Sequence, residues 1–409
     1  MDQNLTATEA APATARTRGP RAALAVRAFR WWFIGQITSA SGLMTQMVAV
    51  GWLVLRWHGD GLELGLLSTA GLGPTLVLGL WAGSLIDHHD RRRILIWTQS
   101  LLTASALVLY ALIATRTASY WPLVALTLAT GAVNSLDGPA RQIYVLDLVG
   151  PERVAGAVSL YEVILNLSRV LGPALGGALL ATSGPAACVL VNATSYLAPL
   201  AVLLATRGQA RSPRAAGARR PSALAGLRYA WSRPLLRACL VLAAASAVLF
   251  NPTLFYPLLA THAFHLGAGG YGLLLALFGL GALPGALLAS HREPTGRRVR
   301  AMAALTGAAV IAAATAPVLP LLLVAVAATG TTSIWMIAAA NTLVQVRTEP
   351  ALRGRVMGAW TMALPGTLPI TALLAGAGAD AFGVRVAYSA AGVVIAAVSL
   401  FGWRAFDDG

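Results

Sequence analysis

The sequence predicts an all-α polytopic membrane protein with twelve transmembrane helices in two six-helix bundles. Three observations predict this class: long apolar runs, scarce charge, and arginines that gather on alternate connections between the runs. The 409 residues are 57% hydrophobic and only 11% charged, with a mean hydropathy of +0.69. A soluble domain carries about 25% charged residues to cover its surface. We therefore expect lipid to surround most of this chain.

The spans follow from the apolar runs, because a helix that crosses the bilayer needs roughly 20 mostly apolar residues. Such runs predict spans at 31–55, 64–86, 94–115, 122–146, 154–180, 185–206, 234–260, 269–290, 301–317, 319–345, 356–377 and 384–403. Trp31, Trp32 and Trp52 lie near span ends and are expected in the interfacial aromatic belt.

The orientation follows from arginine, which supplies all 30 basic side chains. Of these, 25 fall on the N-terminal tail, the connections after even-numbered spans and the C-terminus, whereas Arg56, Arg116 and Arg385 lie on the other side. Basic connections stay in the cytoplasm, so both termini are predicted to be cytoplasmic, in the plasma or inner membrane. The net charge of +15 is not arranged as the basic and aromatic surface of a nucleic-acid binder, and no nucleic-acid partner is expected.

One long polar segment, rich in Arg, Pro, Ala and Gly, divides the chain in two. The predicted domains are a disordered cytoplasmic tail (1–27), an N-terminal six-helix bundle (28–206), a cytoplasmic linker (207–233), a C-terminal six-helix bundle (234–404) and a cytoplasmic tail (405–409). Two such halves form the parallel-repeat plan of one transporter class, whose substrate site lies between the halves.

The connection after the second span, residues 83–93, reads GSLIDHHDRRR. It resembles the G-x-L-x-D-R-x-x-R-R loop of the major facilitator superfamily. The resemblance implies the major facilitator fold and a conformational latch between the halves, formed by Gly83, Asp87, Arg91 and Arg92. His88 replaces an arginine of the family pattern, and the alternative is an ordinary basic loop.

The fifth span contains the sequence GPALGG. It resembles the G-P-x-x-G-G motif in the fifth helix of the family's exporters, and the matching residues are Gly172, Pro173, Gly176 and Gly177. The alternative is close helix packing by small residues. Residues 137–142 and 353–356 resemble the enterobactin-exporter and macrolide-efflux branch. That branch often has an acidic residue after the glycine of span one, where this chain has Leu43.

Polar side chains within the fourth and fifth spans are the candidate substrate and proton residues, because a charge at bilayer depth costs about 2.5–3.5 kcal/mol on insertion scales. They are Asn134, Asp137, Arg141, Glu162, Asn166 and Arg169. The three residues of the fourth span are spaced at i, i+3 and i+7, and those of the fifth span at i, i+4 and i+7. Each spacing puts the three side chains on one helical face. With a rise of about 1.5 Å per residue, Arg141 and Glu162 lie at similar depths and could pair.

Two hypotheses remain open for these residues. In the first, Asp137, Arg141 and Glu162 form an ion network that closes a gate without touching substrate. In the second, Arg169 attracts an anionic or polar substrate to a central cavity that Asn134 and Asn166 share, and Glu162 or Asp137 exchanges a proton. Asn251, Tyr256, Trp335 and Asn341 are weaker cavity candidates from the second half, where interhelical packing is the commoner role.

The chain has no lysine and therefore no G-x-x-x-x-G-K-[ST] loop, which excludes ATP-driven transport by this chain alone. No catalytic residues, metal ligands or cofactor are expected, and the protein is not expected to be an enzyme. The resemblance implies a monomeric secondary active efflux transporter that exports a small amphipathic metabolite or drug, of siderophore or macrolide type, by proton antiport with alternating access. The alternatives are an uptake permease of the same fold and a transport-inactive membrane receptor or assembly subunit.

Overall fold

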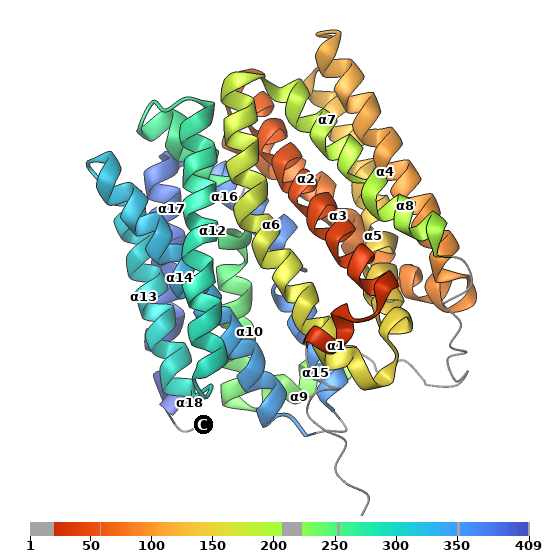
Figure 1. Ribbon diagram of the computed structural model, residues 1–409. Coiled ribbons are helices and arrows are strands. Elements are labelled where there is room, and N and C mark those ends of the chain that lie inside the picture. Colours follow the sequence, from red (N-terminus) through yellow and green to blue (C-terminus); the bar gives the residue numbers. More distant parts are fainter. Residues whose placement is uncertain (1–19, 58, 207–222, 252–253, 350–351, 408–409) are drawn as a thin grey trace, which may run out of the picture.

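The computed structural model describes residues 20–57, 59–206, 223–251, 254–349 and 352–407, and these ranges contain helices and no strand (Figure 1). The elements of the first half are α1 (Pro20–Leu24), α2 (Arg27–Trp57), α3 (Gly61–His88), α4 (Arg91–Ala114), α5 (Tyr120–Val149), η2 (Pro151–Arg153), α6 (Val154–Thr182), α7 (Pro185–Ser195) and α8 (Leu197–Ala205).

The second half is built in the same way but has more breaks. Its elements are α9 (Ala223–Ser232), α10 (Pro234–Ser246), η3 (Ala247–Phe250), α11 (Phe255–Leu258), η4 (Leu259–Ala263), α12 (Ala268–His291), α13 (Gly296–Thr315), α14 (Leu319–Arg347), α15 (Arg353–Ala363), α16 (Leu368–Phe382), α17 (Val384–Phe401) and α18 (Trp403–Asp407).

Among the described residues, ten helical segments are long and apolar enough to cross a membrane, and a bent pair around Arg233 would be an eleventh. The 30-residue helix α5 packs among them against α3 and α4. It is not in that count because the polar residues Asn134, Asp137 and Arg141 interrupt its apolar run. The all-α membrane class is confirmed, and the arrangement is consistent with the twelve predicted spans.

Several spans are broken where a single continuous helix was expected. The range 234–260 is divided among α10, η3, α11 and η4, and the range 356–377 is divided between α15 and α16. The second break contains Pro365 and Gly366, and Pro369 follows it. Proline has no N–H to donate and its ring clashes with the preceding turn, which explains a break at this position.

Two short helices lie in ranges that were expected to be unstructured. Helix α1 packs against α6 within the predicted tail, and α9 packs against α15 within the predicted linker. Residues 1–19 and 207–222 of those two ranges lie outside the described residues. The expectation for Trp32 was wrong: its side chain is fully buried and lies edge-on to Tyr144, with ring centroids 5.2 Å apart.

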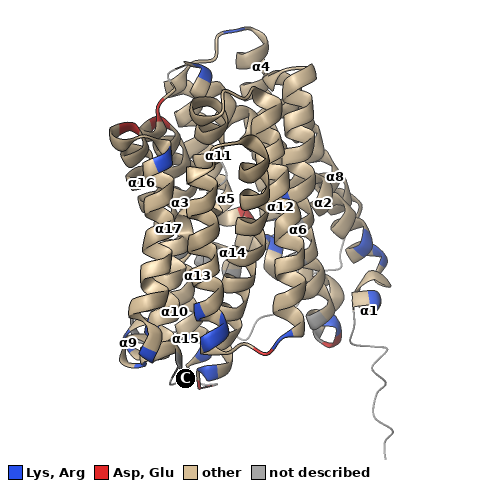
Figure 2. Cartoon of the chain, turned by 90° about the vertical axis from the view of Figure 1, so that its left-hand side faces the viewer, with Lys and Arg blue, Asp and Glu red and all other residues tan. Residues whose placement is uncertain are grey.

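Each half forms its own bundle. Helices α2 to α8 pack mainly on one another, and α9 to α17 form the second bundle, although α16 packs more extensively on α3 than on its own half. Figure 2 shows that arginines gather at the end of the molecule that carries α1, α9 and α15, and we call this end the basic face. We call the opposite end, where α3 and α12 begin, the far face. The two bundles are joined chiefly by α3 against α16 and by α6 against α12.

Candidate functional site

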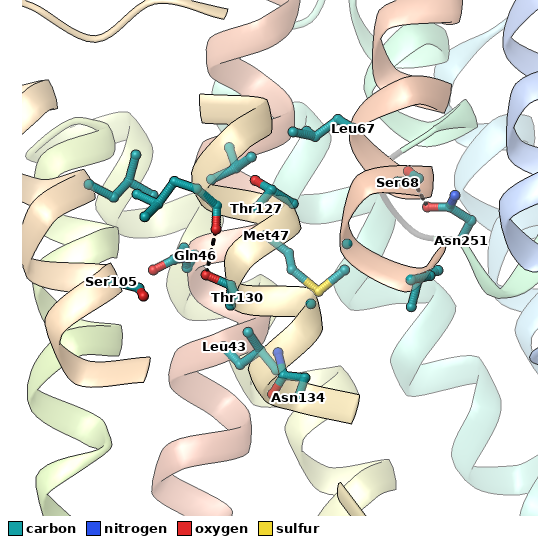
Figure 3. A pocket seen from close by; sticks show the side chains of 16 residues that line it. Leu43, Gln46, Met47, Leu67, Ser68, Ser105, Thr127, Thr130, Asn134 and Asn251 are labelled. Atoms are coloured by element: carbon teal, nitrogen blue, oxygen red, sulfur yellow. Dashed lines mark hydrogen bonds between the residues drawn. The ribbon is translucent and has the colours of Figure 1, made fainter. Parts of the chain in front are cut away.

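A cavity of about 190 Å³ lies between α2, α3, α4 and α5 of the first half (Figure 3). Its apolar walls come from leucine, valine and methionine side chains, with Met47 projecting among them. Its polar lining consists of amides and hydroxyls, from Gln46, Ser68, Ser105, Thr127, Thr130, Asn134 and Asn251. None of the residues that line this cavity is charged. Such a wall suits a ligand that is mostly apolar and carries a few hydrogen-bonding groups.

The second half reaches this cavity through Asn251, which directly follows η3. The hydroxyl of Ser68 on α3 donates a hydrogen bond of 3.4 Å to the side-chain oxygen of Asn251. Both residues are buried. Asn251 is therefore the one weaker candidate from the second half that lines this cavity, and it connects the cavity wall to the other bundle.

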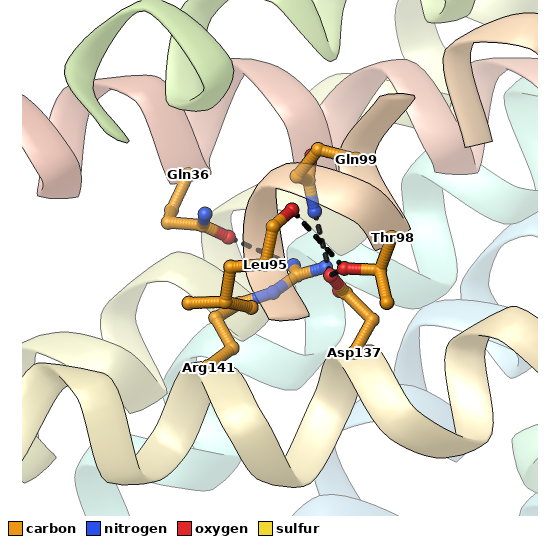
Figure 4. Close-up of polar contacts among 6 residues, drawn as sticks. All are labelled: Gln36, Leu95, Thr98, Gln99, Asp137 and Arg141. Atoms are coloured by element: carbon orange, nitrogen blue, oxygen red, sulfur yellow. Dashed lines mark hydrogen bonds and ion pairs between the residues drawn. The ribbon is translucent and has the colours of Figure 1, made fainter. Parts of the chain in front are cut away.

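Next to the cavity, a buried polar network joins α2, α4 and α5 (Figure 4). The carboxylate of Asp137, which is 0% exposed, accepts hydrogen bonds of 2.7 Å from the Thr98 hydroxyl and 2.8 Å from the Gln99 amide. Arg141 forms an ion pair with Asp137 and donates a hydrogen bond of 2.8 Å to Gln36. The negative and positive charges therefore neutralise each other within the first bundle.

The network is incompletely paired. Within the described part of the chain, three of its buried atoms have no hydrogen-bond partner: Nε of Arg141, Nε2 of Gln36 and Oε1 of Gln99. Buried polar groups are usually paired, because an unpaired one retains the cost of its lost hydration. A polar cluster that raises the energy of the fold in this way is a candidate for function.

The structure separates the residues that the helical spacing of α5 grouped together. Asn134 lines the cavity, whereas Asp137 and Arg141 lie outside its lining and face α2 and α4. Asn134 and Asp137 are one helical turn apart, so the cavity and the network are neighbours. The described partners of Arg141 are Asp137 and Gln36. The side chain of Glu162 lies outside the described part of the structure, so its pairing with Arg141 stays a prediction.

Of the three candidate residues on α6, the structure describes the side chain of only one. The side chains of Glu162 and Asn166 lie outside the described part of the structure. Arg169 is partly buried and is not among the residues that line the cavity. Its backbone carbonyl lies against Gly279 of α12, where a methyl group on Gly279 would come within 2.5 Å of the carbonyl oxygen. Arg169 thus lies where the two bundles meet.

The loop between α3 and α4 carries the predicted latch, and its arginines are bonded within the first half. Arg91 forms an ion pair of 2.5 Å with Asp147 of α5. Nε of Arg92 donates a hydrogen bond of 2.7 Å to the carbonyl oxygen of Leu203 in α8. The packing around Gly83 and the side chain of Asp87 lie outside the described part of the structure. The latch between the halves stays a prediction.

The glycine motif of α6 lies between two neighbouring helices. On one side, Gly172 and Gly176 pack against α2, and the Thr45 hydroxyl donates a hydrogen bond of 3.0 Å to the carbonyl oxygen of Gly172. On the other side, Gly177 lies against Gly272 of α12, and a methyl group on Gly177 would come within 2.6 Å of the Gly272 Cα. The motif therefore brings three helices from both bundles into backbone contact.

A second close contact between the bundles joins α3 and α16. A methyl group on Gly61 would come within 2.7 Å of the Gly376 carbonyl oxygen, and the Thr69 hydroxyl donates a hydrogen bond of 3.1 Å to the carbonyl oxygen of Pro369. These contacts, like that of Gly177 with Gly272, lie toward the far face. Figure 1 shows α6 and α12 closest near that end and separating toward the basic face.

Comparisons with known proteins agree with this architecture. A family model described as a transmembrane secretion effector matches residues 18–406. The multidrug efflux pump Tap of Mycobacterium tuberculosis is 30% identical over 387 residues, which cover 90% of this chain and 91% of that protein. The enterobactin exporter EntS of Citrobacter koseri is 28% identical over 358 residues, covering 86% of this chain and 85% of that protein.

Among solved structures, a bacterial homologue of the iron transporter ferroportin is similar in two states. The inward-facing structure has a TM-score of 0.69 at 16% identity and covers 92% of this chain and 98% of that one. The outward-facing structure with soaked iron has a TM-score of 0.58 at 18% identity and covers 93% of this chain and 98% of that one.

Proposed function

Because the chain belongs to the transmembrane secretion effector family of major facilitator transporters, we propose that it is a secondary active exporter of a small, neutral, amphipathic compound. The observation that carries the proposal is the cavity beside α2, α3, α4 and α5, whose lining is apolar with amides and hydroxyls and without charge. A buried charge without a counter-charge is strongly unfavourable, so this lining favours an uncharged cargo over an anionic one.

Export is favoured over uptake by the named relatives, a multidrug efflux pump and an enterobactin exporter. Siderophore and drug classes both remain open for the cargo, since both contain amphipathic compounds. An anionic cargo would need a cationic contact, and Arg169 at the junction of the bundles is the residue that would supply it. Because the cavity lining is uncharged, an anionic cargo is the weaker assignment.

The conformation fits a transporter with its far face closed. Two close backbone contacts between the bundles, that of Gly61 with Gly376 and that of Gly177 with Gly272, lie toward the far face. The TM-score is also higher for the inward-facing ferroportin homologue than for the outward-facing one, 0.69 against 0.58. We place the basic face in the cytoplasm of the plasma or inner membrane, because basic connections stay on that side.

We propose that the proton gradient drives export by antiport, and Asp137 is the best-supported candidate for the residue that carries the proton. Its carboxylate lies one helical turn from the cavity residue Asn134 and holds Arg141. A proton on Asp137 would weaken that ion pair and release Arg141 toward Gln36 of α2, so protonation would change how α5 contacts α2. Glu162 remains the second candidate.

Purified protein in proteoliposomes tests the proposed function. With an imposed proton gradient, we expect a neutral macrolide to move against its concentration gradient faster than an anionic catecholate siderophore, and protonophore to abolish the movement. Faster movement of the siderophore would contradict the neutral-cargo assignment. If neither compound moves, and no member of a wider panel moves, the result would favour the transport-inactive receptor. If intact cells accumulate the compound through the protein, the result would favour the uptake permease.

Filling the cavity should block export without unfolding the protein. Met47→Trp puts a large ring into the cavity. We expect export to fall about tenfold, because the cargo would have to share the space with the ring, and overpacking costs of roughly 1–3 kcal/mol would then fall on the cargo-bound state. Ile34→Trp is the matched control, since Ile34 lies on the same helix α2 with 48% of its surface exposed. Equal export rates in the two variants, measured in the proteoliposomes, would remove the cavity from the substrate path.

A further inference from the structure

The N-terminus of α3 is capped by a side chain from the other half of the molecule. The backbone N–H of Gly61 donates a hydrogen bond of 2.5 Å to Oδ1 of Asp380, and the N–H of Leu62 donates one of 2.7 Å to Oδ2. Asp380 lies near the end of α16. One carboxylate therefore bonds two N–H groups that are more than 300 positions away in the sequence.

The residue that would normally cap this helix does not do so here. The first N–H groups of a helix have no partner within it, and a side chain at the N-cap position, commonly Asp, usually accepts from them. Asp60 occupies the N-cap position of α3 with extended backbone angles, but its side chain makes no capping hydrogen bond. The helix thus has a suitable cap of its own, and its N–H groups are bonded to Asp380 instead.

The bond between α3 and Asp380 depends on close approach of the two bundles. Gly61 and Gly376 meet with so little space that a methyl group on Gly61 would lie 2.7 Å from the Gly376 carbonyl oxygen and 3.0 Å from Oδ1 of Asp380. A carboxylate next to a helix N-terminus is attracted by the positive end of the helix dipole, and its hydrogen bonds are charge-assisted. Separating the bundles at the far face must break both bonds.

We propose that Asp380 is a latch that holds the far face closed, and that Asp60 takes over the cap of α3 when the bundles separate. This rests on the proposed alternating-access function and adds its far-face gate. An N-cap side chain accepts from the second or third N–H of its helix, so Asp60 would cap the N–H of Leu62 or Glu63, and the N–H of Gly61 would be hydrated once the far face opens. The end of α3 then has a carboxylate cap in both states, which lowers the free-energy cost of opening.

Cysteine labelling tests the latch without substrate or proton gradient. Ser68 lines the cavity and is 8% exposed, so Ser68→Cys reports when the cavity opens to the far face. A membrane-impermeant maleimide is added on the far-face side of oriented vesicles. The native Cys188 and Cys239 are buried, and the parent protein without the added cysteine measures their background labelling.

The two carboxylates should act in opposite directions. We expect Asp380→Ala to speed labelling of Ser68→Cys about fivefold, the effect of losing a typical N-terminal cap, whereas Asp380→Glu should restore the parent rate. Asp60→Ala should slow labelling, because it removes the cap of the open state. Asp380→Asn provides a second variant if Asp380→Ala does not fold.

Two results would overturn the proposal: an unchanged rate in both the Asp380→Ala and the Asp380→Asn variants, or faster labelling in the Asp60→Ala variant. A purely structural role for the two residues would lower stability without giving opposite signs in the labelling rate. The assay needs no export, so failure of the latch leaves the exporter assignment standing. Failed export with the expected labelling rates would leave the latch standing.

Discussion

Asp137→Ala is expected to lower the stability of the protein by about 3–5 kcal/mol, the usual cost of removing one partner from a buried ion pair. The substitution leaves Arg141 buried beside Gln36 without its counter-charge. It also removes the acceptor of the hydrogen bonds from Thr98 and Gln99. Thermal unfolding of the purified protein in detergent measures the loss, and a midpoint equal to that of the parent would contradict the ion pair.

A double substitution separates the structural role of Asp137 from its proposed role in proton exchange. Asp137→Leu combined with Arg141→Met removes both charges, and replacing a buried pair by apolar residues is often neutral or stabilising. We expect the double variant to regain much of the unfolding midpoint but to show no proton-driven export. Recovery of coupled export would mean that the network only supports the fold, and Glu162→Gln would then be the next variant to measure.

Gly272→Ala should reduce export at least about fivefold while the protein still inserts and folds. A methyl group at this position would overlap the backbone of Gly177, and the overlap would force α12 away from α6 and prevent closure of the far face. Overpacking costs roughly 1–3 kcal/mol, which corresponds to about 5–150-fold in an equilibrium between two states. Export in proteoliposomes and far-face labelling of Ser68→Cys measure the two effects.

The control for that variant is three residues away on the same helix. A methyl group on Gly269 would meet only the Cβ of Ala181 at 3.9 Å, which is ordinary contact, so Gly269→Ala should export at the parent rate. Equal export by the two variants would show that the contact between α6 and α12 does not limit the cycle. Faster far-face labelling only in Gly272→Ala would support the proposed role of the α6 glycine motif in closure.

The sequence predicted the membrane class, the spans and part of the cavity, because these depend on local properties. Apolar length determines where a helix can cross lipid, and the ends of most predicted spans differ from the observed helices by only a few residues. Asn134, a candidate from its helical spacing, and Asn251, a weaker candidate from the second half, both line the cavity, and their contact with substrate stays a prediction. The glycine motif of α6 does provide the close helix contact that its small residues allow.

The sequence could not predict which groups become partners. Helix depth put Arg141 level with Glu162, but depth does not determine which neighbouring helix a side chain faces, and it did not identify Gln36 of α2 as a partner of Arg141. The pairing of Arg141 with Glu162 stays a prediction. Asp380 was not singled out from the sequence, because its partner is the backbone of a distant helix and leaves no pattern in the sequence. Trp32 resembled an interfacial residue by position, yet packing against Tyr144 buries it.

The uncharged wall around Met47 and Asn134 has an electrical consequence. If a neutral solute leaves as one proton enters, each turnover carries one net elementary charge inward, and the exchange is electrogenic. Voltage then contributes about 2.3 kcal/mol per 100 mV for that charge, enough for roughly a 50-fold difference in solute concentration. A cell that has lost its pH difference but kept its membrane voltage would still be able to expel the compound.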